Sequence, residues 1–458
     1  MNFLYACAHN LSERIRYSKW QLILFPILFS IIGIYVGIST FERDFIPYKS
    51  FAVENMLLPL IFFAVGFLLP VSLWRRYAIR FSAGRHILWN KGGFSFAFIL
   101  FLIAIFLQAM AIWGDKSWDR IPLDNARLNL KGYYTEAALR SIDEHSYSVP
   151  KDVELARITK NNGITQLRRH LFIFSRPFQV GEFVKIFCMI FMAKLLTDMR
   201  INRQMNLCKE FVGFPFLVLL PICFFTFLMP NYSMMIIYVL LVFFMLFVQE
   251  MNIKSRILLI AVLAIPCVMA FSVQNLDKEN PIVRVHGVNR IWAFFHEDRA
   301  GNDQQNEALQ ALADGGIQGK GLDKGTIKHH LFGARNDFAY SILGEELGLL
   351  RMLPITMALM GFLFTCFWVA GKIKIKNEPY SNYSPKDRDI MFAQNLAWGI
   401  AMIFSLNIFF HIGVNLRLLP NTGQPLSFIS SGGTNLVMNF FLMGMLVQIS
   451  SLNMDKKI

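Results

Sequence analysis

Runs of about 20 apolar residues recur along this 458-residue chain, and they constrain its fold more than any other feature. A helix needs about that length to cross the hydrocarbon core of a bilayer. With 55% hydrophobic and 17% charged residues, the chain has too little polar surface for a water-soluble globule. The eighth run is long enough to bend or to extend beyond the bilayer. The sequence therefore predicts an all-α polytopic membrane protein with about ten transmembrane helices, at residues 20–40, 56–74, 93–113, 178–198, 211–229, 232–249, 257–273, 338–371, 391–411 and 433–450.

The distribution of Lys and Arg predicts the orientation of these helices. Twenty Lys and Arg fall in segments on one side, whereas the short loops on the other side hold only Arg43, Lys49 and Arg417. Because cytoplasmic loops retain positive charge, we expect both termini in the cytoplasm and two long extracytoplasmic loops, 114–177 and 274–337. The net charge of +14 follows from this topology and from contact with anionic membrane lipid, so no nucleic-acid partner is expected.

Residues 415–433 read NLRLLPNTGQPLSFISSGG and lie between the last two apolar runs. A segment that contains Pro420, Gly423 and Pro425 cannot continue as a plain helix. Irregular backbone at membrane depth persists only where protein or water satisfies its N–H and C=O groups. We therefore expect this segment to line a cavity or an interface; the alternative is an ordinary turn between two helices.

Polar side chains inside the apolar runs need partners there. Glu182 and Lys185 are three residues apart on one helical face, which predicts an internal ion pair. Asn407 and His411 are four residues apart and point the same way. For this second pair we expect structural hydrogen bonds between helices rather than catalysis.

Asp337 lies where the long segment 274–337 meets the eighth apolar run. An aspartate in the first turn of a helix is favoured by the helix dipole, which by itself would account for it. A carboxylate at the outer mouth of a polytopic cavity is also well placed as a general base, so the residues alone leave both interpretations open. Glu345 and Glu346 follow about two turns later, and at least one of them should face a polar interior.

The same long segment carries GGIQGKG at 315–321, which looks like a phosphate loop but does not fit one. That motif needs four residues between its glycines and a hydroxyl after its lysine, whereas three residues separate Gly315 from Gly319 and Gly321 follows Lys320. The glycines are expected to form a tight surface turn. Cations near the outer surface suit a diphosphate, which takes paired charge-assisted hydrogen bonds. The candidates are Arg290, Lys320, Lys324, Lys328, Arg335 and Arg417, of which Arg290 and Arg417 are preferred.

Four segments in one order resemble the SEDS proteins (shape, elongation, division and sporulation), the family of RodA and FtsW. LLPNTGQPLSFISSGG at 418–433 resembles the family signature, although Ser427 stands where a proline is usual. FQVGEFVK at 178–185 is similar to its FQPSEFxK segment, and GGIQGKG is similar to its GGxxGKG loop. NDFAYSILGEELG at 336–348 resembles the start of its DF…EELG helix.

The resemblance implies a single SEDS-like transmembrane domain over 1–458, with 274–337 as a catalytic loop and 114–177 as an extracytoplasmic insert. It implies an inverting peptidoglycan glycosyltransferase that polymerises lipid II, an undecaprenyl-diphosphate disaccharide-pentapeptide, at the outer face of the cytoplasmic (inner) membrane. The implied partner is a single-span class B penicillin-binding protein; no cofactor is required, and a role for Mg²⁺ or Mn²⁺ stays open. Residues and resemblance together give catalytic Asp337; substrate- or diphosphate-binding Arg290, Lys320, Arg417, Thr422, Ser430, Gly432 and Gly433; and structural Glu182, Lys185, Glu345, Glu346 and Asn407.

Three other functions stay open on the sequence. A flippase for lipid-linked precursors would use the same polar interior without forming a bond. An O-antigen polymerase or ligase would share the lipid-diphosphate donor but accept different sugars. A non-catalytic scaffold of the division machinery is the third. The sequence does not separate a role in elongation from one in division or sporulation.

Overall fold

The computed structural model describes most of the apolar part of the chain. Some of the predictions fall outside the described residues. They concern the cytoplasmic N-terminus, the loops that carry most of the predicted cytoplasmic cations, and the larger part of the 114–177 insert. The structure describes residues 21–39, 57–75, 85–86, 89–90, 95–118, 170–173, 176–201, 208–229, 231–249, 253–273, 275–276, 280, 286–296, 299–329, 331, 333–373, 384–431 and 433–452.

The described chain is mostly helical, and each predicted apolar interval overlaps a helix. Three described helices are long and apolar enough to cross a membrane, namely α17 (Ala339–Lys372), α18 (Pro385–Asn415) and α19 (Gly433–Ser451). The number of helices that cross stays a prediction. The other elements in the apolar intervals are α2 (Gln21–Ser39), α4 (Leu58–Leu68), α5 (Val71–Arg75), α6 (Phe96–Trp118), α11 (Val180–Ile201), α12 (Cys208–Leu228), α13 (Tyr232–Phe247) and α14 (Ile253–Val273).

The second predicted span is interrupted, which the sequence analysis missed. Helix α4 ends at Leu68, and Leu69 has an extended backbone with ψ of 120° before α5 begins at Val71. The cause is Pro70, whose ring disfavours helical backbone at the preceding residue. The interval 56–74 therefore contains two helices separated by a break at Leu69 and Pro70, and not one continuous helix.

Two short hairpins were also not predicted. Strand β1 (Arg85–His86) pairs with β2 (Trp89–Asn90), and β3 (His170–Ile173) pairs with β4 (Arg176–Gln179), both antiparallel. Strand β4 leads directly into α11, so the fourth helix begins two residues later than the predicted start at 178. The backbone N–H of Gln179 donates to Thr434 Oγ1 over 3.2 Å, which ties this hairpin to the start of α19.

Helix α19 lies at the centre of the fold and α17 at its edge. In the most apolar window of each helix, 94% of α19 is buried but only 28% of α17. Glycines bring α4 against α19: a Cβ on Gly66 would lie 2.2 Å from Phe441 O, and one on Gly444 would lie 2.2 Å from Phe63 O. Larger residues at either position would force the two backbones apart, because a Cβ atom cannot lie 2.2 Å from a carbonyl oxygen.

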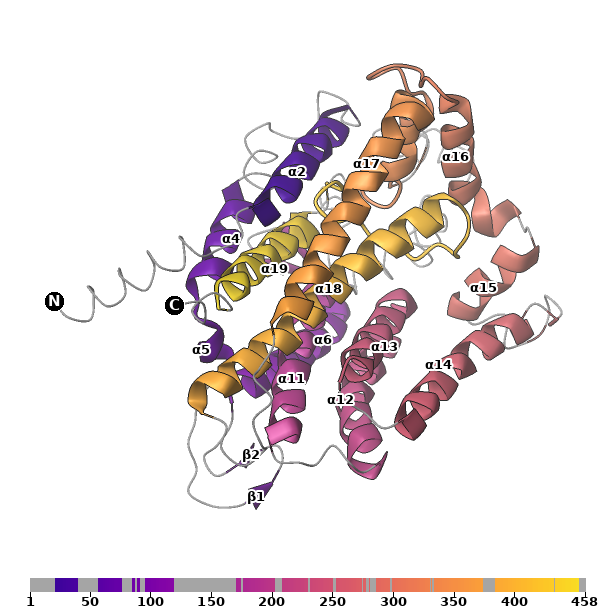
Figure 1. Ribbon diagram of the computed structural model, residues 1–458. Coiled ribbons are helices and arrows are strands. Elements are labelled where there is room, and N and C mark those ends of the chain that lie inside the picture. The colour runs from indigo at the N-terminus through magenta and orange to yellow at the C-terminus, as the bar shows by residue number, and fades with distance from the viewer. Residues whose placement is uncertain are drawn as a thin grey trace.

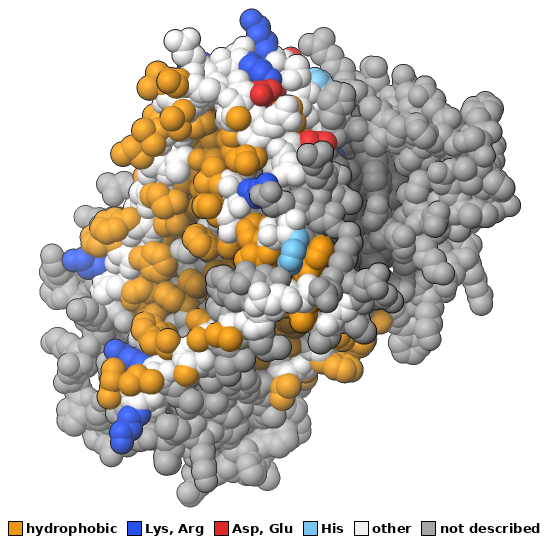
Figure 2. All heavy atoms as spheres, turned by 90° about the vertical axis from the view of Figure 1, so that its right-hand side faces the viewer, with side chains coloured by type: hydrophobic (Ala, Val, Ile, Leu, Met, Phe, Trp, Pro, Cys, Tyr) orange, Lys and Arg blue, Asp and Glu red, His pale blue; other side chains and the backbone are white. Residues whose placement is uncertain are grey.

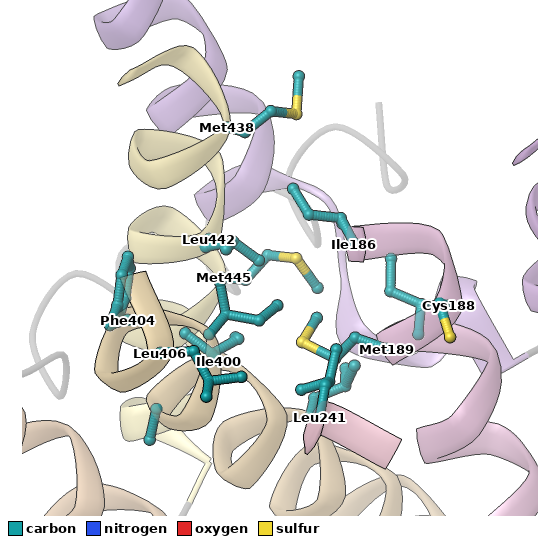
Figure 3. Packing of buried hydrophobic residues seen from close by; sticks show 14 of the residues in the cluster. Ile186, Cys188, Met189, Leu241, Ile400, Phe404, Leu406, Met438, Leu442 and Met445 are labelled. Atoms are coloured by element: carbon teal, nitrogen blue, oxygen red, sulfur yellow. The ribbon is translucent and has the colours of Figure 1, made fainter. Parts of the chain in front are cut away.

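Flexible side chains fill the space between α11, α13, α18 and α19. Figure 3 shows Met189, Leu241, Met445 and their neighbours converging there, all of them buried. A Cβ on Gly399 of α18 would lie 2.5 Å from the Met189 side chain, so this glycine makes room for it. Methionine suits such a junction because its unbranched chain fills irregular gaps.

Exposed apolar side chains cover the outer surface of α17. Leu353, Met357 and Phe364 are 54%, 66% and 72% exposed, and their spacing places them on one helical face. Figure 2 shows hydrophobic side chains gathered in a band on one side of the molecule, with Lys and Arg mainly toward the ends of that band. A hydrocarbon environment accommodates such a face, as expected for a multi-pass membrane protein.

Figure 1 shows α17 running across the molecule, with α16 (Arg299–Gly315) beside its N-terminal end. Helix α15 (His286–His296) and the short 3₁₀ helix η4 (Ile327–His329) complete the described part of segment 274–337. This segment meets the start of α17 and the irregular loop after α18. The candidate site lies at that junction.

Candidate functional site

The turn that precedes α17 places Asp337 just outside the helix. Gly333 has a positive φ of 78°, and its carbonyl accepts from the backbone N–H groups of Asn336, Asp337 and Phe338 at 3.0, 2.9 and 3.2 Å. The helix begins at Ala339, and its first turn contains no acidic residue. Asp337 therefore lies immediately before the N-cap residue Phe338 and outside the first helical turn.

Two glycines border the Asp337 carboxylate from different parts of the chain. A Cβ placed on Gly333 or on Gly423 would lie 3.5 Å from Asp337 Oδ2, and Gly423 has a positive φ of 61°. The Asp337 side chain is half-buried in this position. The predicted irregular loop therefore lies beside the predicted catalytic aspartate.

The irregular loop is confirmed as non-helical from Leu416 to Ser431, and it docks on the turn before α17. Ser430 Oγ donates to Asn336 O over 2.6 Å and accepts from Leu426 N–H over 2.8 Å. The N–H of Ser431 donates to Arg335 O over 3.1 Å. Ser430, predicted as a substrate contact, therefore holds backbone, and its hydroxyl is already engaged.

Helix α16 supports the same loop. Gln305 is buried, and its Nε2 donates to Val414 O over 3.1 Å and to Leu419 O over 2.8 Å. Asn421 Nδ2 donates to Gln304 Oε1 over 3.3 Å. These contacts bridge the end of α18 and the first part of the loop, so the loop conformation depends on α16.

A buried aromatic anchor fixes the second half of the loop. Phe428 has a positive φ of 65°, which is uncommon outside glycine and asparagine, and it is 1% exposed. Its ring lies 5.4 Å from the rings of Phe404 and Phe440 and 5.6 Å from that of Phe362. Packing against three rings offsets the backbone strain. On the other side, a Cβ on Gly33 of α2 would lie 2.4 Å from Ile429 O, so α2 abuts this backbone directly.

Several buried polar atoms near Asp337 have no hydrogen-bond partner among the described residues. They are Thr422 Oγ1, Asn336 Oδ1, Gln424 Oε1 and Ser431 Oγ. Such atoms are normally satisfied by protein, water or ligand, so here they are available to water or to a polar ligand. Thr422 was a predicted contact. Asn336 and Gln424 were missed, although both flank residues that were singled out in the sequence.

The predicted cations differ in how well they suit a diphosphate. Arg417 has a positive φ of 55° and a partly exposed side chain inside the irregular loop. Arg290 lies in α15, but its side chain is outside the described part of the chain, as is Gly432. Gly433 is the first residue of α19. Lys320 Nζ pairs with Glu345 Oε1 at 2.7 Å and with Asp314 Oδ2 at 2.9 Å, so carboxylates of the protein already neutralise it.

Glu345 binds the turn made by GGIQGKG and the residues after it. Its Oε1 accepts from Lys320 Nζ and, at 2.8 Å, from the Thr326 N–H. A Cβ on Gly325 would lie 2.9 Å from Glu345 Oε2, so only glycine fits beside this carboxylate. Hydrogen bonds to Glu345 and Asp314 raise the pKa of Lys320. The structure thus favours a structural role for Lys320 over the predicted diphosphate contact.

Glu346 binds the same segment from its other side. Its Oε1 accepts from Lys328 Nζ at 2.9 Å and its Oε2 accepts from the Tyr35 hydroxyl at 2.6 Å. Lys328 also donates to Asp323 Oδ1 at 2.6 Å, and the Asp323 N–H donates to Tyr35 at 3.0 Å. Burial lowers the pKa of Lys328, but its hydrogen bonds to Asp323 and Glu346 outweigh this and the pKa is raised.

The segment also fills a break in α17. Gly348 has φ of 71° and ψ of 171°, so α17 is two helices joined at this residue, as its predicted length allowed. The N–H groups of Lys320 and Gly321 donate to the carbonyls of Glu345 and Glu346 at 2.9 and 3.0 Å. Carbonyls freed by the break are thereby satisfied. The predicted tight turn at 315–321 is confirmed, with positive φ at Gly316, Gly319 and Gly321.

The predicted ion pair in α11 is confirmed. Lys185 Nζ lies 2.8 Å from Glu182 Oε2, and both side chains are 1% exposed. Lys185 also donates to Asn407 Oδ1 at 3.2 Å, and Asn407 Nδ2 donates to Ser427 Oγ at 3.3 Å. The predicted hydrogen bond between helices therefore exists. It connects α11 through α18 to the irregular loop at the position where a proline is usual in the family.

Within the described residues, no group of three or more His, Cys, Asp or Glu side chains could hold a metal ion. The buried carboxylates Glu182, Glu345 and Glu346 are each paired with a lysine. The chemistry that the described residues supply is a carboxylate beside several polar groups.

Comparison with known proteins gives matches to one family. The sequence model of the FtsW, RodA and SpoVE family, described as cell cycle protein, matches residues 165–454. The probable peptidoglycan glycosyltransferase FtsW of Pseudomonas fluorescens is 30% identical over 275 residues, 59% of this chain and 62% of that protein. The protein of that description from Francisella salina is 28% identical over 275 residues, again 59% and 62%. The one from Borreliella burgdorferi is 31% identical over 297 residues, 63% and 72%. The matched part thus spans less than two thirds of the first two relatives.

Solved structures share the fold. One similar solved chain is described as "Structural coordination of polymerization and crosslinking by a peptidoglycan synthase complex". Its TM-score is 0.62 and its sequence identity is 16%, and the match covers 94% of this chain and 97% of that one. The rod shape determining protein RodA of Thermus thermophilus has a TM-score of 0.52 and 16% identity, with 94% and 96% covered. At this identity the likeness establishes the fold alone, that of a polytopic helical membrane protein.

Proposed function

This chain belongs to the FtsW, RodA and SpoVE family, and on that premise we propose that it is a peptidoglycan glycosyltransferase that polymerises lipid II into glycan strands for elongation or division. The observation that carries the proposal is the placement of Asp337. Its carboxylate lies half-buried between Gly333 and Gly423, where the segment before α17 meets the irregular loop. Asn336, Thr422 and Gln424, the sequence neighbours of Asp337 and Gly423, carry buried polar atoms that have no hydrogen-bond partner among the described residues.

The proposed location is the cytoplasmic membrane, with about ten crossing helices, both termini inside and the site at the outer face. The bias of Lys and Arg between the two sets of loops supports this orientation. An enzyme at that face has no nucleotide sugar available. The activated sugar must therefore arrive on a lipid, with a diphosphate as leaving group, and lipid II has that chemistry.

In the proposed reaction, Asp337 acts as the general base. Its carboxylate takes the proton from the 4-hydroxyl of the acceptor sugar as that oxygen attacks the anomeric carbon of the donor. The new C–O bond forms as the bond to the diphosphate oxygen breaks, and the configuration at the anomeric carbon inverts. Undecaprenyl diphosphate leaves with the electron pair. The proton remains on Asp337 until it is lost to water.

Negative charge develops on the diphosphate as it leaves, and nearby cations would stabilise it. Arg417 is the first choice, because it lies in the irregular loop whose Gly423 borders Asp337 and its side chain is partly exposed. Arg290 is the second, from its place in α15. Lys320 is the weakest of the predicted three, since Glu345 and Asp314 already bind its ammonium.

The proposed partner is a single-span class B penicillin-binding protein, which would cross-link the new strand. Its support is that the solved chain of similar fold comes from a complex described as coordinating polymerization and crosslinking. The exposed apolar faces of the described helices would take a further helix within the bilayer.

The test is polymerisation of labelled lipid II by the purified protein with its transpeptidase present. Asp337→Asn keeps the size of the side chain but removes the base. We expect wild-type protein to form polymer and the variant to lose at least about 100-fold in rate, the usual contribution of a general base. Asp314→Asn, which changes an exposed carboxylate on α16, is the matched control and should retain activity.

Polymer made by Asp337→Asn at the wild-type rate would remove the base assignment. If wild-type protein moves labelled lipid II across liposomes without making polymer, it is a flippase. If it does neither while its complex still assembles, it is a scaffold. Polymer formed from an O-antigen precursor but not from lipid II would indicate an O-antigen polymerase.

A further inference from the structure

Asn415, the last residue of α18, contacts the turn that contains Asp337 and the start of α17. Asn415 Nδ2 donates to Asp337 O over 3.1 Å and to His411 O over 2.8 Å. Its Oδ1 accepts from Ser341 N–H over 3.0 Å and from Ser341 Oγ over 2.6 Å. An asparagine side chain has two donor hydrogens and two acceptor lone pairs, and here all four are used. Asn415 is fully buried, so none of these bonds exchanges with water.

His411, one turn earlier, makes the second set of contacts. Its Nε2 accepts from the Tyr340 N–H over 3.3 Å, so the imidazole is neutral with its proton on Nδ1. Nδ1 then donates to Gln424 O over 2.8 Å. Gln424 follows Gly423, the glycine that borders the Asp337 carboxylate. His411 therefore fixes the loop on one side of the carboxylate and the start of α17 on the other.

These contacts replace the missing cap of α17. The N-cap residue, Phe338, makes no side-chain cap, and the first N–H groups of a helix need partners from elsewhere. His411 supplies one to Tyr340, and Asn415 supplies a second acceptor to the Ser341 N–H, which also donates to Phe338 O over 3.0 Å. We propose that Asn415 and His411 are positioning residues that cap α17 in trans and set the Asp337 carboxylate against the irregular loop. This inference rests on the proposed function and identifies residues that act on its rate through Asp337.

The expected size of the effect follows from the geometry. Loss of the Asn415 amide frees the peptide between Asp337 and Phe338, and a displacement of about 1 Å at a reacting group costs about 100-fold in rate. Substrate binding should change little, because neither side chain is exposed to substrate. We therefore expect Asn415→Leu to lower kcat for lipid II polymerisation about 10- to 100-fold, with KM within about twofold.

A matched control lies on the same helix. Asn395 is also buried, and it bonds to Thr197 and Gln249 instead. Twenty residues of helix separate it from Asn415, about 30 Å. Asn395→Leu should lower the melting temperature as much as Asn415→Leu does, yet leave kcat within about threefold of wild type. A merely structural role for Asn415 would make the two variants alike in kcat.

A conservative pair at His411 gives a second measurement. His411→Gln keeps one donor and one acceptor, so it should retain much more kcat than His411→Leu, which has neither. Equal loss in both, or kcat within threefold of wild type for a folded Asn415→Leu, would overturn the inference. Should Asn415→Leu not fold, the His411 pair decides. If wild-type protein makes no polymer, the proposed function itself fails, and that outcome is distinct from a wild-type protein that is active but insensitive to both positions.

Discussion

Removal of Lys328 should loosen the 316–329 segment by an amount that the structure allows us to estimate. Lys328 and Glu346 are each 1% exposed and lie 2.9 Å apart, so Lys328→Met leaves a buried carboxylate without its cation. Breaking a buried pair from one side costs about 3–5 kcal/mol. The Tyr35 hydroxyl still donates to Glu346, which favours the lower end of that range. At 1.4 kcal/mol per tenfold, this corresponds to about 150- to 4,000-fold more frequent local opening.

Hydrogen–deuterium exchange measures that opening directly. The amides to follow are those of Lys320 and Gly321, which bond to the carbonyls of Glu345 and Glu346 in the break of α17. The internal control is the other partner of Lys328, since the Asp323 side chain is 72% exposed. An exposed pair contributes at most about 1 kcal/mol, so Asp323→Asn should accelerate exchange less than about fivefold.

A double variant separates charge from packing. Lys328→Met combined with Glu346→Gln removes both buried charges and keeps the Tyr35 hydrogen bond, so exchange should return to within about tenfold of wild type. The reasoning is refuted if Asp323→Asn accelerates exchange as much as Lys328→Met, or if the double variant opens as often as the single one. Either result would mean that the buried pair does not hold the segment.

Two further predictions follow from the same contacts and from helix packing. The pKa values of Lys320 and Lys328 are raised on folding, so the stabilisation that these lysines contribute should be complete below the ordinary lysine pKa of about 10.4 and lost as pH rises through the folded values. Hydrogen exchange of the 316–329 segment, corrected for intrinsic rates, should therefore stay constant from about pH 6 to 10 and increase above that. Gly444→Ala should destabilise the protein by about 1–3 kcal/mol, because its Cβ would lie 2.2 Å from Phe63 O. Gly361→Ala is the control and should be tolerated, since no atom lies within 4 Å of its Cβ. The two variants are compared by thermal unfolding in detergent, and equal melting temperatures would contradict the close packing of α4 and α19.

Features that depend on local sequence, namely the length of an apolar run, the spacing of residues on one helix and the composition of a loop, were predicted well. The apolar runs located the helices, because about 20 apolar residues have few other uses. The spacing of three residues predicted the Glu182–Lys185 pair, which depends on one helix only. The composition of 415–433 predicted irregular backbone, which the structure confirms from Leu416 to Ser431.

Features that depend on contacts between distant segments were not predicted. Asn415 and Ser341 are 74 residues apart, and no local pattern indicates that one caps the helix of the other. Lys320 was assigned to a diphosphate because it is a cation in a segment predicted at the outer surface, but it binds Glu345, 25 residues later. The hairpins escaped notice because strands of two to four residues are too short to show alternation. The break at Leu69 could have been predicted from the sequence, because Pro70 disfavours helical backbone at the residue before it.

The contacts around Asp337 explain why this part of the fold is built from so many separate elements. Gly333 and Gly423 border the carboxylate, and glycine has no side chain with which to hold a neighbour in place. Each glycine segment is therefore fixed from outside: Ser430 and Ser431 bind the turn before α17, and His411 binds the loop beside Gly423. Such an arrangement holds the backbone on both sides of the carboxylate in place, as the proton transfer proposed for Asp337 would need. It follows that the residues that determine the geometry at Asp337 lie largely outside the motif that contains it, on α16, α18 and the irregular loop.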